Sequence, residues 1–214
     1  MKLFSYFRSS AAWRVRIALA YKGIPHGTVP VHLVRDGGQQ HSESYRELNP
    51  QGFVPALEDE GQVFAQSIAI IEYLEETHPE PPLLPHDFAG RARVRQMALA
   101  IACDIHPLQN LRVLNYLRGP LGQGDGPVAD WVRHWIAEGF RPLEELARRY
   151  GDGGTHLYGA SVTMADVCLV PMVYNARRWH LDLKPYPALV AIDALLMTLP
   201  AFSTTRPEAQ ADAE

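Results

Sequence analysis

The sequence predicts an α/β module at the N-terminus followed by an all-helical domain, and two observations support this prediction. Short runs of β-branched and aromatic residues alternate with helical patterns over residues 1–80. This strand signal disappears after a proline-rich stretch at residues 79–85. The chain has 214 residues, of which 47% are hydrophobic, so both parts can bury a core.

The N-terminal module is expected to have the element order βαβαββα. Gly23 predicts the end of the first helix, because glycine commonly follows a helix C-terminus. Asp59-Glu60-Gly61 predicts a hairpin turn between the last two strands. The predicted strands cover residues 2–7, 28–33, 54–57 and 62–65, and the predicted helices cover 11–22, 42–48 and 67–77.

A linker is expected between this module and the helical domain. Four of the seven residues 79–85 are proline, which fixes φ and removes a backbone donor. The expected limits are residues 1–80 for the α/β domain, 81–90 for the linker and 91–214 for the helical domain. The helices predicted in that domain cover 91–118 (with a kink at Pro107), 128–150, 164–178 and 187–199. The small, polar residues 207–214 predict a frayed tail.

The run Thr163-Met164-Ala165-Asp166 marks the start of one of these helices. Thr163 can cap the helix N-terminus while the Asp166 carboxylate reaches back to the capping residue. We expect this capping box to be structural, and loss of the cap alone to cost about 1 kcal/mol.

Composition excludes several functional classes. The net charge is −4 and no basic tract stands out, which argues against nucleic acid as the main partner. The longest apolar run, Met97–Cys103, is far too short to span a membrane, and the first residues do not resemble a secretory signal. Two cysteines favour a reducing cytoplasm over a disulfide framework. The nine histidines fit no metal-binding spacing, so no metal site is predicted. Of the 20 basic residues 17 are arginine, which indicates either codon bias or a few guanidinium groups that bind planar anions.

Three places carry candidate ligand-binding groups. Ser9 and Ser10 follow the first strand and open a helix, where free N–H groups and a hydroxyl could hold an anion. Gln66 and Ser67 open the last helix of the module in the same way, and simple helix capping is the alternative at both places. A proline that opens a strand, as in Val54-Pro55, is unusual, and a cis peptide there would present the Val54 backbone to a ligand. In a βαβαββα module all three places fall at one end of the sheet, which favours a small, anionic, peptide-like ligand.

Four motifs of the chain are informative in combination: Tyr6–Leu19, Leu48-Asn49-Pro50-Gln51, Ile70–Glu76 and Asp104–Asn110. Together they resemble the zeta class of glutathione transferases, a class that includes maleylacetoacetate isomerase and the bacterial maleylpyruvate isomerases. The combination is specific, whereas any one motif alone would not be. The resemblance covers nearly the whole chain and implies a thioredoxin-like N-terminal domain followed by an all-helical domain.

The resemblance also implies roles for individual residues and glutathione as the cofactor. The Ser9 hydroxyl would stabilise the glutathione thiolate, with Ser10 supporting it and Arg8 beside them in the catalytic group. Arg8, Arg112 and Arg178 would line the pocket for an acidic substrate. The residues implied to bind glutathione are Val54 and Pro55 at the cysteinyl backbone, Gln66 and Ser67 at the γ-glutamyl end, and Gln39, Gln51, Gln109 and Asn110 around the tripeptide or the site entrance.

The function implied by this resemblance is the cis–trans isomerisation of a maleyl keto diacid. The expected reaction converts maleylacetoacetate into fumarylacetoacetate in aromatic amino-acid catabolism, in a cytoplasmic homodimer. The alternatives are a maleylpyruvate isomerase of gentisate degradation and a general glutathione transferase. A non-enzymatic binding module is disfavoured, because both Ser9 and Ser10 are present. One position departs from the pattern: Ala11 stands where the class usually has cysteine, which weakens the maleylacetoacetate assignment but leaves the hydroxyl mechanism untouched.

Overall fold

A computed structural model describes residues 1–214 and divides the chain into two compact units. Unit 1 comprises residues 1–83 and 198–214, and unit 2 comprises residues 84–197. The second unit therefore begins inside the predicted linker. The last residues of the chain pack with the α/β part of the molecule, although the sequence grouped them with the helical domain.

Unit 1 is built on a four-stranded sheet with the strand order β2-β1-β3-β4. Strand β1 is parallel to β2 and antiparallel to β3, and β3 is antiparallel to β4. The predicted order βαβαββα is confirmed. The strands are β1 (Lys2–Ser5), β2 (Gly27–Pro30), β3 (Ala56–Asp59) and β4 (Gln62–Ala65), and the helices are α1 (Ser10–Tyr21), α2 (Glu43–Leu48) and α3 (Ser67–Thr77), with 3-10 turns η1 (Arg35–Gly37) and η2 (Gln39–His41) between β2 and α2.

Two strands are shorter than the sequence predicted. β1 ends at Ser5 because the Ser9 backbone N–H donates to the Tyr6 carbonyl over 3.0 Å, which closes a turn where the strand was expected to continue. β2 then ends at Pro30, which lies opposite Ser5 in the ladder, and not at Leu33.

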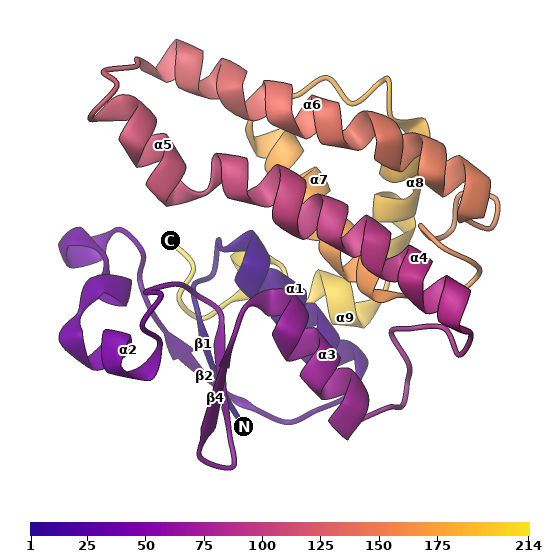
Figure 1. Cartoon of the computed structure of the whole chain (residues 1–214), viewed down its shortest axis with the longest axis horizontal. Coiled ribbons are helices and arrows are strands. Elements are labelled where there is room, and N and C mark those ends of the chain that lie inside the picture. The colour runs from indigo at the N-terminus through magenta and orange to yellow at the C-terminus, as the bar shows by residue number, and fades with distance from the viewer. The chain divides into compact units, whose positions relative to one another are not determined.

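Helix α1 lies almost entirely inside unit 1. Every residue from Ala12 to Leu19 is buried, including Arg14 and Arg16. The helix packs against α3 and also against α9 (Pro200–Ser203), a short helix near the C-terminus (Figure 1). A helix that is buried on all sides must satisfy its two guanidinium groups internally, and this requirement shapes the site described below.

Unit 2 is entirely helical. The interruption predicted at Pro107 is present, but it is larger than a kink, because the helix expected over 91–118 is broken into four parts. Pro107 provides the reason: it has no N–H, and the chain around it adopts a π-helical segment and a 3-10 turn before a new helix begins at an Asn110 cap. The elements of unit 2 are α4 (Phe88–Leu99), η3 (Ala100–Ile105, π-helical), η4 (His106–Gln109), α5 (Leu111–Arg118), α6 (Asp125–Tyr150), α7 (Met164–Arg178) and α8 (Pro187–Leu196).

The capping box at the start of α7 is confirmed. The buried Asp166 carboxylate accepts hydrogen bonds from the backbone N–H groups of Thr163 and Leu157, each over 2.8 Å, and from the Thr163 hydroxyl over 2.8 Å. Burial raises the pKa of Asp166, and the three hydrogen bonds oppose that shift. The box thus ties the incoming loop to a helix that forms much of the core of unit 2.

The predicted frayed tail is wrong. Pro207 is buried, and the side chain of Asp212 accepts a hydrogen bond from the backbone N–H of Phe7 over 3.0 Å. Glu214 pairs with Arg35. The composition of residues 207–214 did not predict these contacts, because every partner lies far away in the sequence.

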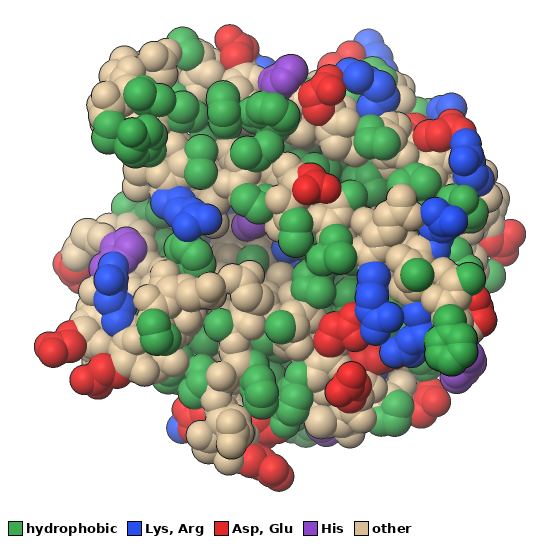
Figure 2. Space-filling model, in the orientation of Figure 1, with side chains coloured by type: hydrophobic (Ala, Val, Ile, Leu, Met, Phe, Trp, Pro, Cys, Tyr) green, Lys and Arg blue, Asp and Glu red, His purple; other side chains and the backbone are tan.

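The surface carries both signs of charge. Figure 2 shows Lys and Arg side chains interspersed with Asp and Glu on the face in view. None of the helices combines the length and the apolar character that crossing a bilayer requires.

Candidate functional site

The sheet topology brings the three predicted ligand-binding places to one end of the sheet in unit 1. In the ladder, Phe4 of β1 pairs with Ala56 of β3, which pairs in turn with Ala65 of β4. The C-terminal ends of β1 and β4 and the N-terminal end of β3 therefore lie at the same end of the sheet. The turn after β1, the Val54–Pro55 peptide before β3 and Gln66 after β4 all lie next to these ends, as the sequence predicted.

Ser9 is the N-cap of α1. Its side-chain oxygen accepts a hydrogen bond from the backbone N–H of Ala12 over 3.2 Å, and Ser10 is the first residue of the helix. Both serines are half-buried. The cap uses only a lone pair of the Ser9 oxygen, so the hydroxyl hydrogen remains available to donate. Capping and anion binding, which the sequence left as alternatives, are compatible in this geometry.

The Val54–Pro55 peptide bond is cis, and Val54 is buried just outside the β3 ladder. The loop before it is held at the Phe53 carbonyl, which accepts a hydrogen bond from the Tyr45 hydroxyl over 2.7 Å and from the Asn49 amide over 2.8 Å. Burial raises the pKa of Tyr45 to about 12, so this hydroxyl stays protonated as a donor. Two side-chain hydrogen bonds thus fix the backbone at this end of the sheet.

Gln66 adopts a left-handed conformation with φ 71° immediately before α3. Its side-chain amide donates to the Gln51 side-chain oxygen over 2.9 Å, so two residues that the resemblance assigned to glutathione contact each other. Ser67 is buried, and its hydroxyl oxygen accepts a hydrogen bond from Arg14 over 3.3 Å. The left-handed residue turns the chain from β4 into the helix and leaves the N-terminus of α3 at the same end of the sheet.

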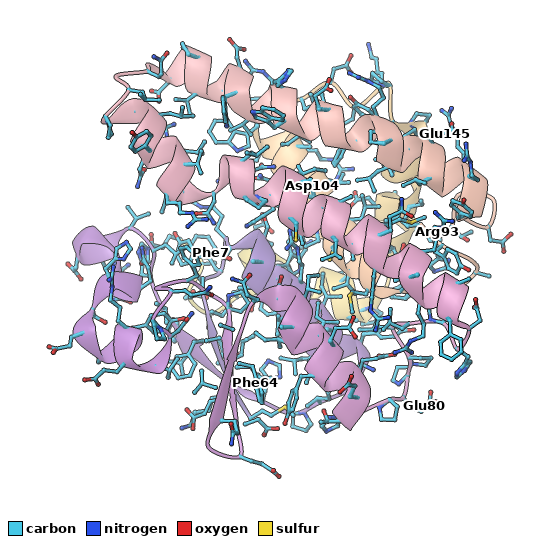
Figure 3. The ribbon with its side chains drawn as sticks, viewed as in Figure 1. Phe7, Phe64, Glu80, Arg93, Asp104 and Glu145 are labelled. Carbon is cyan, nitrogen blue, oxygen red and sulfur yellow. The ribbon has the colours of Figure 1, made fainter.

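Arg8 and Gln39 lie on exposed loops of unit 1. The Arg8 guanidinium lies 5.7 Å from the ring centroid of Phe7, which is labelled in Figure 3. Gln39 opens η2, and its side-chain oxygen accepts a hydrogen bond from the backbone N–H of His32 over 2.8 Å.

The other four predicted residues belong to unit 2. Asn110 caps α5 by accepting a hydrogen bond from the Arg112 backbone N–H over 3.2 Å, and Arg112 is exposed on the first turn. Gln109 is buried, and its amide nitrogen lies 3.2 Å from the sulfur of Met172. These residues follow the π-helical segment on which Asp104 is labelled in Figure 3.

Arg178 ends α7 and is held by a chain of side-chain amides. Its Nε and one terminal nitrogen donate to the Asn175 side-chain oxygen over 3.1 and 2.8 Å. The Asn175 amide in turn donates to the side-chain oxygen of Gln109. Both amides are buried, whereas the arginine is exposed, so the chain runs from the core of unit 2 to a charged group at its surface.

Four residues that support these groups were not predicted from the sequence: Arg14, Arg16, Asn175 and Asp212. Arg14 and Arg16 stand among residues that are apolar on every side of α1, and that pattern could have indicated buried guanidinium groups with internal partners. Asn175 lies three residues before Arg178 on one helix, a spacing at which side chains meet. For Asp212 the sequence held no signal.

The structure brings together no group of His, Cys, Asp and Glu side chains that could hold a metal ion. Both cysteines are free; Cys103 is exposed and Cys168 is buried. The hydrogen-bond donors among the candidate groups are serine hydroxyls, helix N-termini and guanidinium groups, a donor set that suits anions rather than cations.

Two family models match the chain. Residues 3–82 match the glutathione S-transferase N-terminal domain, and residues 129–192 match the glutathione S-transferase C-terminal domain. The chain belongs to the glutathione S-transferase family.

Close relatives place this glutathione S-transferase in the zeta class. It is 49% identical over 211 residues to a probable maleylacetoacetate isomerase of Vibrio cholerae, covering 99% of this chain and 97% of the relative. It superimposes with a TM-score of 0.96 and 43% identity on the holo structure of a bacterial zeta-class maleylpyruvate isomerase, with 100% of both chains covered. A maleylacetoacetate isomerase from Anaeromyxobacter dehalogenans, with dicarboxyethyl glutathione and citrate bound in its active site, matches with a TM-score of 0.86 and 40% identity over 100% of this chain and 97% of that one.

Proposed function

We propose that this protein is a glutathione-dependent cis–trans isomerase of maleyl keto diacids, converting maleylacetoacetate into fumarylacetoacetate in aromatic amino-acid catabolism. The observation that carries the proposal is the half-buried Ser9 hydroxyl at the N-terminus of α1, with its hydrogen available to donate. The relative with bound dicarboxyethyl glutathione supports it, because that ligand joins glutathione to a dicarboxylic acid.

The residues at this end of the sheet, where β1 and β4 finish and β3 begins, fit glutathione. Two helix N-termini suit its anionic groups: α1 the thiolate and α3, with Gln66 and Ser67, the carboxylate of the γ-glutamyl end. The Val54 backbone, outside the strand ladder, would pair with the cysteinyl peptide. Gln51 would act through its hydrogen bond to Gln66. When bound, glutathione would supply a thiolate that adds reversibly to the double bond of the acid, permits rotation, and leaves.

The task of Ser9 is to hold that sulfur as an anion at neutral pH. A free thiol has a pKa of about 8.5, so only about 3% is ionised at pH 7. Lowering the pKa by about two units requires about 2.7 kcal/mol of preference for the anion. A hydroxyl hydrogen bond to a charged group contributes about 1.5–3 kcal/mol, and a helix N-terminus about 0.3–1 kcal/mol. Ser9 and the start of α1 together therefore match the requirement.

The task of the arginines is to neutralise the acid. Two carboxylates and a keto oxygen that gains negative charge during the reaction call for fixed cationic donors. Arg8, Arg112 and Arg178 are the candidates, and the Asn175 side chain orients Arg178 by accepting from two of its nitrogens. Ser10 and Pro55 would support the neighbouring groups, and Gln39, Gln109 and Asn110 would complete the surroundings of the ligands.

A second candidate is a maleylpyruvate isomerase, favoured by the similarity to the holo structure of that enzyme. Ala11, at the position where cysteine is usual, favours this candidate over the first. A general glutathione transferase would share the thiolate site but would have no need of several carboxylate-binding arginines.

An ultraviolet assay with maleylacetoacetate and maleylpyruvate, each with and without glutathione, tests the three functions. The isomerase proposal expects a trans product, dependence on glutathione, and full recovery of the glutathione. The acid with the higher kcat/KM distinguishes the two isomerases. A stable thioether as the main product would instead establish a transferase and overturn the proposal.

We also propose a cytoplasmic homodimer. The free thiols of Cys103 and Cys168 support a reducing compartment, and the family resemblance supports the dimer. Sedimentation equilibrium would check the dimer, since a monomer mass at micromolar concentration would contradict it.

A further inference from the structure

The C-terminal strap, residues 198–214, crosses the helix and the turn that carry Ser9. Near its start, the indole nitrogen of Trp13 donates to the Thr205 hydroxyl over 3.0 Å, and Nε of Arg16 donates to the Thr205 carbonyl over 3.1 Å. Both donors lie on α1, against which α9 of the strap packs (Figure 1). The strap is therefore anchored to the helix that Ser9 caps.

The strap and Arg16 together hold the peptide groups of Phe7 on both sides. The Phe7 N–H donates to Asp212 over 3.0 Å, and the Phe7 carbonyl accepts from Arg16 over 2.8 Å. The preceding carbonyl, that of Tyr6, accepts both from Arg16 over 3.3 Å and from the backbone N–H of Ser9 over 3.0 Å. Four hydrogen bonds thus fix the turn between β1 and α1, two residues before the candidate catalytic hydroxyl (Phe7 is labelled in Figure 3).

The hydrogen bonds of Arg16 to Ser5, Tyr6 and Phe7 are buried, whereas those of the strap to Phe7, Trp13 and Arg16 are partly buried. Arg16 is 3% exposed, and it also donates to the Ser5 hydroxyl over 2.9 Å. Its guanidinium therefore has four acceptors, three on β1 and the turn and one on the strap, and it binds all four only where the turn and the strap are both in place. Burial lowers the pKa of Arg16 to about 10, and the nearby Asp212 opposes that shift, so the side chain remains a cation at neutral pH.

Charge alone does not explain an aspartate at this position. A carboxylate close to the turn disfavours an anion bound there, and Asp212 and Glu214 both raise the pKa of the neighbouring Tyr6, although burial is the largest cause of that shift. Any benefit of Asp212 to a thiolate site must therefore come from the geometry that it imposes on the Phe7 peptide.

We propose that Asp212 and Arg16 are positioning residues that fix the turn between β1 and α1, so that the Ser9 hydroxyl is directed at the glutathione sulfur. Neither residue needs to contact a ligand. This inference rests on the proposed role of Ser9 in the isomerase and adds the C-terminal strap to the parts of the chain on which that role depends.

The test compares D212A, D212N and R16K with the control Q210A. The Gln210 side chain donates to the Arg206 carbonyl within the strap, so Q210A perturbs the strap without releasing Phe7. D212N keeps an oxygen that can accept from the Phe7 N–H, and R16K keeps the charge but cannot hold several carbonyls at once. Calorimetry gives the Kd of glutathione, and ultraviolet titration of the bound thiolate gives the pKa of the thiol.

We expect D212A and R16K each to raise the thiol pKa by about one pH unit and to lower kcat/KM about tenfold at neutral pH. D212N and Q210A should stay within about twofold of the wild type, because both keep the turn fixed. A purely structural strap would change the melting temperature but not the thiol pKa, and an unchanged pKa in folded D212A and R16K overturns the proposal. An electrostatic role of Asp212 would be revealed by D212N lowering the pKa, which also overturns it.

Two further measurements keep the result decisive. If neither D212A nor R16K folds, amide hydrogen exchange of Phe7 in the wild type decides, because rapid exchange would mean that Asp212 does not hold this peptide. Failure of the proposed function is separate: in that case the wild type would not bind glutathione, or S9A would leave the thiol pKa unchanged. If S9A raises that pKa and D212A does not, only the strap inference fails.

Discussion

The two units hold their candidate ligand groups by different means. In unit 1 the groups are placed by the backbone: an N-cap at Ser9, a left-handed residue at Gln66 and a cis peptide before Pro55. In unit 2 the exposed Arg178 is placed by side chains, through Asn175 and the buried Gln109. The local backbone conformation at each of these places is set by a few neighbouring residues, and Asp212 is the one distant anchor of the turn before Ser9. The hydrogen-bonded side chains that hold Arg178 instead need partners 63 to 66 residues apart in the sequence.

The largest effect is expected from S9A, which removes the hydroxyl that we propose to stabilise the glutathione thiolate. Loss of one hydrogen bond to a charged sulfur, about 1.5–3 kcal/mol, should lower kcat/KM about 10- to 100-fold and raise the pKa of bound glutathione. Loss of the cap should also cost about 1 kcal/mol of unfolding free energy. Stopped-flow kinetics and urea unfolding measure the two effects separately.

Ser42 provides a matched control for this prediction. It is the N-cap of α2 and accepts a hydrogen bond from the Tyr45 backbone N–H over 3.3 Å. S42A should show a comparable loss of stability and nearly full activity. Equal activity in the two variants would mean that Ser9 only caps its helix.

The next largest effect is expected from R178A, which removes the exposed guanidinium at the end of the hydrogen-bonded series Gln109, Asn175 and Arg178. A guanidinium that binds a substrate carboxylate contributes about 1.5–3 kcal/mol, so KM for the diacid should rise about 30-fold. KM for a neutral electrophile should change little. R149A is the control, because Arg149 pairs with Glu145 on an exposed helix face. A similar rise in KM for both electrophiles would remove Arg178 from the carboxylate site.

A smaller effect is expected from N175A, which leaves Arg178 in place but removes the acceptor of two of its hydrogen bonds. The arginine then loses its fixed orientation and regains rotamer freedom, which costs about 1 kcal/mol when a carboxylate binds. KM should therefore rise about fivefold, with kcat nearly unchanged. N115A, at an exposed asparagine of α5, should leave both constants as they are. An N175A variant with wild-type KM would show that Arg178 needs no support from the core.

The same contrast between local and distant partners explains which predictions from the sequence succeeded. The order βαβαββα, the serine cap at the start of α1, the hairpin at Gly61 and the Thr163–Asp166 capping box all depend on residues within a few positions of one another, and all are present in the structure. The bounds of α3 were predicted to the residue, because the end of a strand at Ala65 and the apolar stripe of Ile70, Ile71 and Leu74 mark the helix locally.

The errors have two sources. Around Pro107 the cause is local: the sequence predicted a kink within 91–118, but the chain there is rearranged into π and 3-10 turns. At the C-terminus distant partners decide the structure. Residues 207–214 have the composition of a frayed tail, yet Phe7 and Arg35 hold them. No local pattern marks Asp212 as a partner of a residue 205 positions earlier.

The smallest effect is expected from E214Q, which tests whether the strap acts through its charges or through the hydrogen bond between Asp212 and Phe7. Glu214 pairs with Arg35 and lies 3.4 Å from the His32 ring, but the Glu214 and Arg35 side chains are 51% and 60% exposed. Exposed ion pairs contribute about 0–1 kcal/mol, because water and salt screen them. E214Q should therefore change the Kd of glutathione less than about twofold, and added salt should change the wild type as little. If E214Q weakens glutathione binding as much as D212A does, the strap acts as a whole through its charges. If E214Q weakens binding only slightly, the effect of the strap comes from the single hydrogen bond between Asp212 and Phe7.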